Sequence, residues 1–327
     1  MTRYFLGVDA GASKTHALVM TEEGSLLGWG ESGTGNHETY GFDHARNSIG
    51  TALRMAADAS GIDPSQGDYA CFCLAGADVS QDYETIPQRI LDPLLGNVPY
   101  SLKNDAFGCL RGGTRSPYGI MINCGTGQVA VGRDRAGKAI RIGGYGFEFG
   151  DYSGGSVIAQ AAVAAVVRAD DGRGEATQLT EWLLEAANLD TVSALIDRTY
   201  RDDAYLASLG VPALTFRASA AGDQVARRII LAAAEEMAVT ATALVRRLEM
   251  EQEEFDLITA GSVFRGEDPV FLETVIQSIR PIAPRANHCF PLYAPVVGAV
   301  LLASEEAGLT VSDSMYSNLE ATMPEEL

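Results

Sequence analysis

Apolar residues along the chain fall into short extended runs separated by small-residue turns, and this arrangement occurs twice. The first copy has runs and turns at residues 4–9, 10–15, 17–20, 22–24 and 26–30. The second copy has them at residues 118–123, 124–128, 129–132, 135–138 and 139–144. An internal repeat describes the architecture of a chain better than any single motif does. The pattern predicts two similar three-stranded units, each led by a glycine-rich turn.

Between the two copies the pattern changes to alternating helix and strand. Residues 43–60 carry an apolar stripe at helical spacing, and Gly61 follows as a helix-ending residue. A continuous apolar run at 68–74 predicts a buried strand, which precedes a predicted helix at 84–95 and a strand at 98–102. Three hairpin strands followed by strands that alternate with helices form one mixed α/β unit.

The second copy leads into a long helical insertion at residues 156–250. Helices are predicted there at 156–168, 176–187, 191–198 and 220–247, and the elements after it are a strand at 255–259 and helices at 269–279 and 295–307. We therefore expect an α/β protein with an N-terminal domain at 1–117 and a C-terminal domain at 118–307. The tail after Gly308 is polar and acidic, so we expect little order in it, and any helix at about 308–327 should return to the first domain.

Charge and composition narrow the range of partners. The chain has 327 residues, enough for two domains, with 24 basic and 43 acidic residues and a net charge of −19. This field disfavours nucleic acids and anionic membranes as partners, although backbone N–H groups and a metal ion can still hold phosphates locally. No apolar run has the length of a membrane span, and the N-terminus runs into a strand without a leader pattern. We expect a cytoplasmic protein.

These patterns resemble the actin-like superfamily of sugar kinases and heat-shock ATPases. The resemblance covers the chain from Asp9 to the last predicted helix, and within the superfamily it is closest to the N-acetylglucosamine kinase group and its BadF/BadG-type ATPase relatives. It implies two ribonuclease-H-like domains with a central cleft, the helical insertion lying in the second. It also implies ATP and Mg²⁺ as cofactors, a small-molecule sugar as substrate and, by family analogy, a homodimer.

The first small-residue turn follows Asp9 at the end of a predicted strand. Such turns let backbone N–H groups approach phosphate oxygens, and a carboxylate there can hold Mg²⁺ through water. By itself the turn could be an ordinary hairpin, and it is not a Walker A loop, but its repetition favours a phosphate site. The resemblance assigns ATP binding to both turns and to the loop after the strand at 255–259: Gly11, Ala12, Ser13, Lys14, Thr15, Gly125, Thr126, Gly127, Gly261 and Ser262.

Asp105 is the candidate catalytic residue. It follows an apolar strand and opens a predicted helix, so by itself it could be a simple N-cap. Transfer of a phosphoryl group to an alcohol requires a carboxylate that orients the hydroxyl and takes its proton. Asn104-Asp105 matches the family's Asn-Asp pair, in which the aspartate is the general base.

The resemblance places sugar recognition on five residues. They are Asn36, Asn104, Thr126, Tyr145 and Asp151. His37, beside the first of them, is expected to be structural. The sequence departs from the family at Gly150-Asp151-Tyr152-Ser153-Gly154, where one residue is added and an acidic neighbour is missing, and Gln128 stands where a serine is common. Both departures leave the identity of the acceptor open.

Three functions compete on this fold. The first is an ATP-dependent kinase of an amino sugar or hexose, N-acetylglucosamine or glucosamine foremost. The second is a BadF/BadG-type ATPase that activates a dehydratase or reductase through an iron–sulfur cluster, which iron content would reveal. Cys71 and Cys73 lie in a predicted strand and Cys109 in a helix, so a thiolate set in a glycine-rich loop is not visible. The third, a sugar-sensing repressor, needs a DNA-binding segment that the acidic chain lacks.

Overall fold

The computed structural model describes residues 2–200 and 203–327, so residues 201–202 of the expected insertion lie outside the described part. The chain divides into two compact units. Unit 1 runs to Met121 and also contains Phe290–Leu327, whereas unit 2 is Ile122–Cys289.

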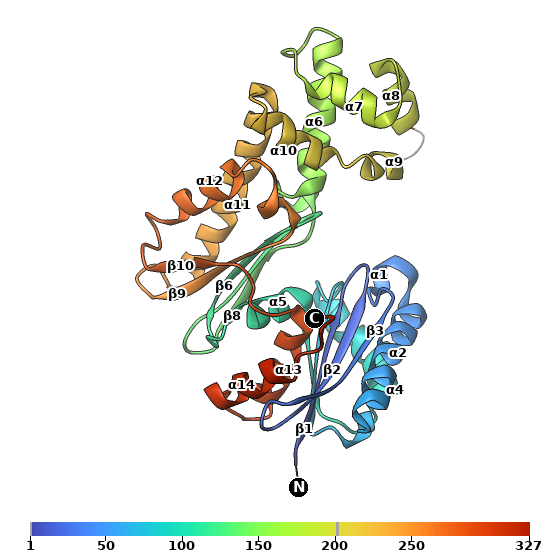
Figure 1. The fold of residues 1–327 in the computed structure, drawn as a ribbon, viewed down its shortest axis with the longest axis vertical. Helices are drawn as coiled ribbons and strands as arrows, with labels where there is room; N and C mark the ends of the chain where they lie inside the picture. Colours follow the sequence, from blue (N-terminus) through green and yellow to red (C-terminus); the bar gives the residue numbers. More distant parts are fainter. Residues whose placement is uncertain (1, 201–202) are drawn as a thin grey trace. The chain divides into compact units, whose positions relative to one another are not determined.

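Unit 1 is built on a five-stranded sheet with the strand order β3-β2-β1-β4-β5 (Figure 1). Its strands are β1 (Tyr4–Ala10), β2 (Thr15–Thr21), β3 (Leu26–Ser32), β4 (Tyr69–Leu74) and β5 (Tyr100–Asn104). β2 is antiparallel to both β1 and β3, whereas β4 is parallel to both β1 and β5. The ends of β1, β4 and β5 therefore meet at one edge of the sheet, where Asp9 and Asn104 lie.

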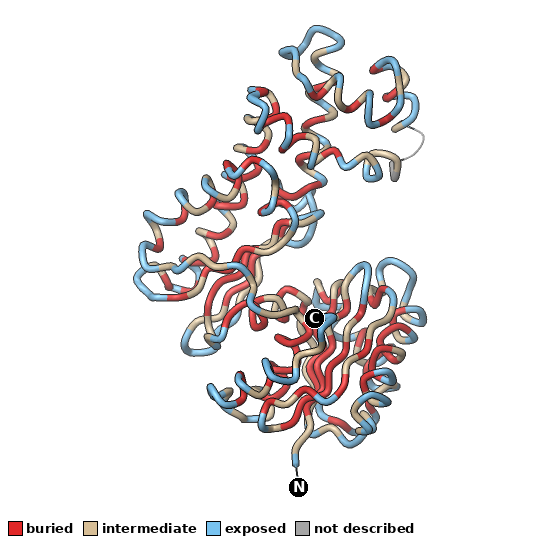
Figure 2. The backbone as a smooth tube through the Cα atoms, viewed as in Figure 1, coloured by how far each residue is buried: buried red, intermediate tan, exposed pale blue. Residues whose placement is uncertain are grey.

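Helices cover both faces of this sheet. They are α1 (His37–Tyr40), α2 (Phe42–Ser60), α3 (Ser80–Ile86), α4 (Asp92–Leu95), α5 (Asp105–Gly113), α13 (Pro295–Glu306) and α14 (Asp313–Ala321), with a π-helical turn at Pro87–Leu91. Successive residues of β4 point to opposite faces of the sheet. Phe72 packs in the core between the sheet and α2, whereas Cys71 and Cys73 pack in the core on the side of α13 and α14. All three side chains are fully buried, as the buried strands of Figure 2 illustrate.

Unit 2 repeats the strand order of unit 1 around its own sheet, β10-β9-β6-β7-β8. The strands are β6 (Gly119–Cys124), β7 (Gln128–Arg133), β8 (Ala139–Gly143), β9 (Phe255–Ala260) and β10 (Ala286–Cys289). The helices are α6 (Gly155–Asp170), α7 (Leu179–Ala187), α8 (Val192–Thr199), α9 (Asp203–Ser208), α10 (Val211–Ala220), α11 (Gln224–Arg247) and α12 (Val270–Ile279). The predicted two-domain α/β fold with a hairpin-led repeat is confirmed.

The C-terminal part of the chain differs from the expectation. We expected the last helix in the second domain and little order beyond Gly308, but α13 packs against β1 and α5 of unit 1, and α14 is a helix whose residues Met315, Tyr316 and Leu319 belong to the same core. The expected boundary at 307 is therefore replaced by the return of the chain to unit 1 at Phe290. The alternative expectation, a helix within 308–327 that returns to the first domain, agrees with α14.

Candidate active site

The first small-residue loop joins β1 to β2 and is fixed by backbone hydrogen bonds. Gly11 N donates to Lys14 O (2.8 Å), and the Thr34 hydroxyl donates to Gly11 O (3.0 Å). Ala12, Ser13 and Lys14 are exposed, so the tip of the loop is open to a ligand. Lys14 Nζ lies 2.9 Å from Glu31 Oε2, so the ammonium group of this loop residue is paired with a carboxylate of β3.

Two carboxyl groups of unit 1 lie close together beside this loop. Asp9 is near the end of β1, where it pairs with Cys73 of β4, and Asp105 is the first residue of α5. Burial, and then the charge of Asp105, raise the pKa of Asp9 to about 8. A half-buried carboxyl that shares its surroundings with a second one is favoured in its neutral form unless a cation joins them.

The loop after β4 connects the two predicted sugar-binding asparagines of unit 1. Asn36 caps α1, and its Oδ1 accepts a hydrogen bond from Glu38 N (2.9 Å). A Cβ atom at Gly76, whose φ is +84°, would lie 2.6 Å from that same oxygen. Asn104 caps α5 by accepting from Ala106 N (3.1 Å) and donates Nδ2 to Asp78 Oδ1 (3.0 Å). The residue at 76 must therefore be small for Asn36 to keep its place.

Asp78 is a further candidate for the site, which the sequence pattern did not single out. Residues 75–78 follow β4 directly, whereas Asp9 and Asn104 lie at the ends of β1 and β5, and the ends of these parallel strands meet at one edge of the sheet. That rule could have found it. His37, by contrast, stacks on Phe42 with ring centroids 4.5 Å apart, and its Nε2 lies 3.6 Å from Asp82 Oδ1. These contacts suit the structural role that we expected for His37.

The second small-residue loop joins β6 to β7 in unit 2 and supports the start of α6. Gly125 N donates to Gly127 O (3.0 Å), while Gly155 N and Ser156 N donate to the carbonyl oxygens of Gly125 and Thr126 (2.8 and 2.9 Å). Gly154 has a φ of +108°, and a Cβ atom there would lie 2.8 Å from the Gly127 carbonyl carbon. The loop and the helix thus meet through their backbones.

The predicted adenosine loop lies against the same end of β6. Gly261 has a φ of +96°, and a Cβ atom there would be 2.3 Å from Cys124 O. Ser262, the next residue, is exposed and begins a short 3₁₀ turn. Unit 2 therefore brings together Gly125, Thr126, Gly127, Gly261 and Ser262, which the sequence separates by more than a hundred residues.

The structure places the carboxylate of Asp151, predicted to bind the sugar, against the backbone of its own loop. Asp151 is only 7% exposed. Its Oδ2 accepts hydrogen bonds from Tyr145 N and Gly146 N (2.7 Å each), and Gln128 Nε2 donates to its Oδ1 (3.3 Å). The carboxylate therefore holds the glycine-rich loop after β8 in shape. Tyr145 is 47% exposed. The guanidinium carbon of Arg141 lies over the ring of Tyr145, 4.5 Å from the centroid of that ring.

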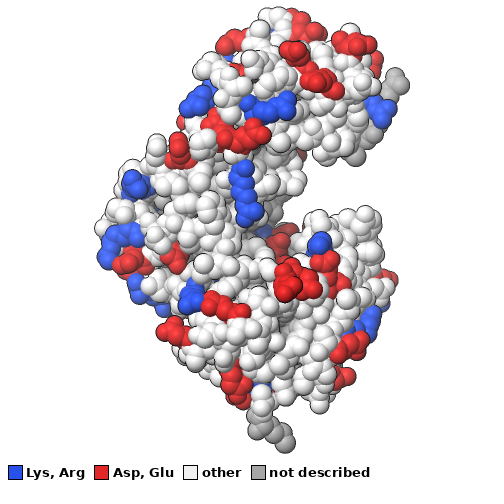
Figure 3. Space-filling model, viewed as in Figure 1, with Lys and Arg blue, Asp and Glu red and all other residues white. Residues whose placement is uncertain are grey.

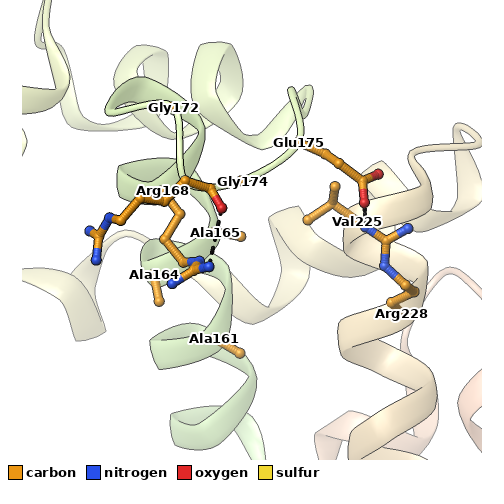
Figure 4. Close-up of a pocket in the computed structure, with 10 residues that line it drawn as sticks. Ala161, Ala164, Ala165, Arg168, Gly172, Gly174, Glu175, Val225 and Arg228 are labelled. Carbon is orange, nitrogen blue, oxygen red and sulfur yellow. Dashed lines mark hydrogen bonds and ion pairs between the residues drawn. The ribbon is translucent and has the colours of Figure 1, made fainter.

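Two grooves lie on the helical part of unit 2, apart from the predicted site residues. Figure 4 shows the first, about 460 Å³ in volume, between α6 and the start of α11, where Arg228 pairs with Glu175 (2.9 Å). The second, about 520 Å³, continues along these helices to Phe147 and Tyr152. On the face drawn in Figure 3, lysine and arginine side chains are scattered among acidic ones.

The sequence profile of the BadF/BadG/BcrA/BcrD ATPase family matches residues 6–303. The chain belongs to this family. No helix among the described residues of this family member has the length and apolarity to cross a membrane.

Curated relatives of the family member cover almost its whole length. It is 27% identical over 91% of its residues to an N-acetyl-D-glucosamine kinase of Dictyostelium discoideum, 97% of which is covered. It is 28% identical over 93% of its residues to an N-acetylmuramic acid/N-acetylglucosamine kinase of Clostridium acetobutylicum, 99% of which is covered.

Solved structures share the fold. A protein of Chromobacterium violaceum described as an N-acetylglucosamine kinase superposes with a TM-score of 0.69 at 23% identity, covering 92% of this chain and 98% of its own. A ROK-family glucokinase of Streptomyces griseus, solved with glucose and AMPPNP, gives 0.55 at 20% identity, covering 92% and 99%. The fold of this family member is thus that of two-domain sugar kinases.

Proposed function

We propose that this protein is an ATP-dependent kinase of an amino sugar, with N-acetylglucosamine or glucosamine as the first candidates. The observation that carries the proposal is the pair of neighbouring carboxyls, Asp9 and Asp105, in the same unit as the loop at residues 11–15, whose tip at 12–14 is exposed. Phosphoryl transfer needs a base for the acceptor, donors for the phosphates and charge compensation, and these residue types supply them. Support for the acceptor class comes from the relatives named as kinases of amino sugars.

The residues fit a divalent cation. Carboxylate oxygens are the ligands that Mg²⁺ prefers, and the pKa of Asp9 is raised first by burial and then by the charge of Asp105, a charge that a bound cation would compensate. Asp9 would hold it, directly or through water. When bound, the cation neutralises charge on the β- and γ-phosphates of ATP.

The remaining steps fall to residues of the chain. The loops at 11–15 and at 125–127 would bind the phosphates, through backbone N–H groups other than those of Gly11 and Gly125, which donate within the loops, and the loop at 261–262 would bind the adenosine. Asn36 and Asn104 would orient the acceptor, while Asp105 takes the hydroxyl proton. The hydroxyl oxygen then forms its bond to the γ-phosphorus as the bond to the β–γ bridging oxygen breaks, and ADP leaves.

The proposal is tested by an acceptor screen. ADP release, measured in a coupled assay, should rise at least about tenfold over the sugar-free background with the preferred amino sugar and less with plain hexoses. The sugar phosphate should appear in equal amount by mass spectrometry. ADP release that does not depend on any sugar would contradict the kinase assignment.

Asp151 gives a prediction for the acceptor side. Asp151→Asn should raise the KM for the sugar by about tenfold and leave the KM for ATP unchanged, because the amide replaces a charged acceptor of two backbone N–H groups and loosens the loop that carries Tyr145. Initial rates at varied sugar and varied ATP measure this. Asp134→Asn is the matched control, since Asp134 Oδ1 accepts from Lys138 N (2.9 Å) in the β7–β8 turn. An equal change in both KM values would contradict the prediction.

The resemblance also leads us to propose a cytoplasmic homodimer, and sedimentation equilibrium of the purified protein would test the dimer.

A further inference from the structure

The helix that carries Asp105 is held at its far end by a buried arginine. Arg111 lies on the last turns of α5 and is only 3% exposed. Its Nε donates to Glu305 Oε1 of α13 (2.9 Å), its Nη1 to Thr114 O (3.0 Å) and its Nη2 to the Tyr316 hydroxyl of α14 (2.8 Å). Each nitrogen of the guanidinium therefore has a partner, as a buried charge requires.

Tyr316 completes this contact from the C-terminal helix. Its hydroxyl accepts from Arg111 and donates to Arg115 O (2.8 Å), just beyond the end of α5. Its ring stacks on Tyr293, with centroids 6.3 Å apart and planes at 13°. The hydroxyl of Tyr316 thus joins the C-terminal helix to the side chain of Arg111 in α5 and to the backbone of Arg115 just after it.

The middle of α5 leaves no room for adjustment. A Cβ atom at Gly298 of α13 would lie 2.0 Å from Gly108 O in the middle of α5, and one at Gly112, next to the end of the helix, would lie 2.9 Å from Ala294 O. The backbones of α5 and α13 are therefore in direct contact. The far end of this nine-residue helix is held by backbone hydrogen bonds from Leu292 N to Gly113 O (3.3 Å) and from Tyr293 N to Gly112 O (2.9 Å). The bond between Arg111 and the Tyr316 hydroxyl adds a side-chain contact there, so together these contacts set the tilt of α5.

We propose that Arg111 is a positioning residue for Asp105, and that the C-terminal helix acts on catalysis through the hydroxyl of Tyr316. The inference rests on the proposed kinase function. Asp105 is the first residue of α5, so any tilt of the helix moves its carboxylate relative to the acceptor hydroxyl. Small displacements of a catalytic group cost much more rate than binding affinity.

Tyr316→Phe tests the proposal because it removes the hydroxyl and keeps the ring. We expect kcat to fall about ten- to a hundredfold while both KM values stay within about twofold. Amide hydrogen exchange at residues 105–110 should accelerate in the same variant. Ile49→Val, which removes one buried methyl group from α2 in the other core of unit 1, is the control for a general loss of stability.

A purely structural role would give a different result. The melting temperature of Tyr316→Phe would then fall as in Ile49→Val, with kcat of the folded enzyme equal to that of the control, and this outcome would overturn the proposal. Hydrogen exchange at 105–110 separates the two hypotheses that are combined here. If the parent protein has no sugar kinase activity but exchange is faster in Tyr316→Phe than in the parent, the proposed function is refuted and the coupling of α14 to α5 stands. If exchange is the same in both proteins, the coupling itself is refuted.

Discussion

Asp105→Asn should lower kcat by about two to four orders of magnitude, the usual contribution of a general base. The amide has the shape of the carboxylate and can still orient the acceptor hydroxyl, but it cannot take the proton. The cap on α5 should persist, because Asn104 provides it by accepting from Ala106 N. Steady-state rates with the preferred sugar measure the loss, and calorimetry should find nucleotide affinity within about threefold of the parent.

Asp43→Asn is the matched control for this variant. Asp43 is an exposed carboxyl in the first turn of α2 in the same unit, and it pairs with Arg46 at 3.1 Å. Both substitutions remove a charge that favours a helix N-terminus, so a loss of activity from that cause would occur in both. A parental rate in Asp105→Asn would contradict the role of Asp105, and a large loss in Asp43→Asn would show that the assay reports folding instead.

The sequence predicted the two sheets because their pattern is local. Extended runs such as 4–9 and 118–123 alternate with turns at similar spacing, and hairpin strands pair with their neighbours along the chain. The two carboxyl residues could also be predicted from the sequence, since Asp9 lies near the end of an apolar strand and Asp105 begins a helix. Residues at such boundaries are recognisable without tertiary information.

The placement of α13 could not be predicted in this way. Its membership of unit 1 depends on backbone contacts, of Gly298 with Gly108 and of Val300 with Gly7, between segments almost two hundred or more residues apart. An apolar helix that follows the second sheet has the same pattern whichever unit it joins. The four-residue strand β10 was missed because so short a run carries little periodicity.

Asp151 illustrates a different limit. The family resemblance assigns it to the sugar, and its neighbours in sequence agree with that role. Its contacts with Tyr145 N, Gly146 N and Gln128 appear only when the loop folds back on itself, through glycines with positive φ such as Gly143 and Gly144. The fold determines which donors form hydrogen bonds to a carboxylate, and the residue type alone does not predict them.

Asp9→Asn should abolish most of the activity and at the same time stabilise the metal-free protein at alkaline pH. Activity should fall by at least about a hundredfold, because the carboxylate proposed to hold the cation is gone. The gain in stability follows from the raised pKa. The carboxyl of Asp9 binds its proton more tightly in the folded protein, with a pKa of about 8, than in the unfolded chain, where the ordinary value is 3.8.

The pH range of this effect follows from the two pKa values. Below about pH 4 the carboxyl is protonated in both states, and the stability that its protonated form contributes is fully present. As the pH rises from about 4 to about 8, the unfolded chain releases the proton and the folded protein keeps it, so the parent protein loses stability. The amide in Asp9→Asn cannot ionise and resembles the protonated carboxyl, so the variant escapes this loss.

Melting temperatures of the metal-free proteins at pH 5 and pH 8.5 measure the difference. We expect Asp9→Asn to exceed the parent by a few degrees at the higher pH and by less at the lower, corresponding to about 1–3 kcal/mol because a half-buried group keeps part of its hydration. Asp58→Asn, which removes an exposed carboxyl of α2 in the same unit, is the matched control. Added Mg²⁺ should stabilise the parent at pH 8.5 and not the variant, because only the parent has the second carboxylate that a cation would join to Asp105. A variant less stable than the parent at pH 8.5 would contradict the raised pKa of Asp9. Equal stabilisation of both proteins by Mg²⁺ would place the cation elsewhere.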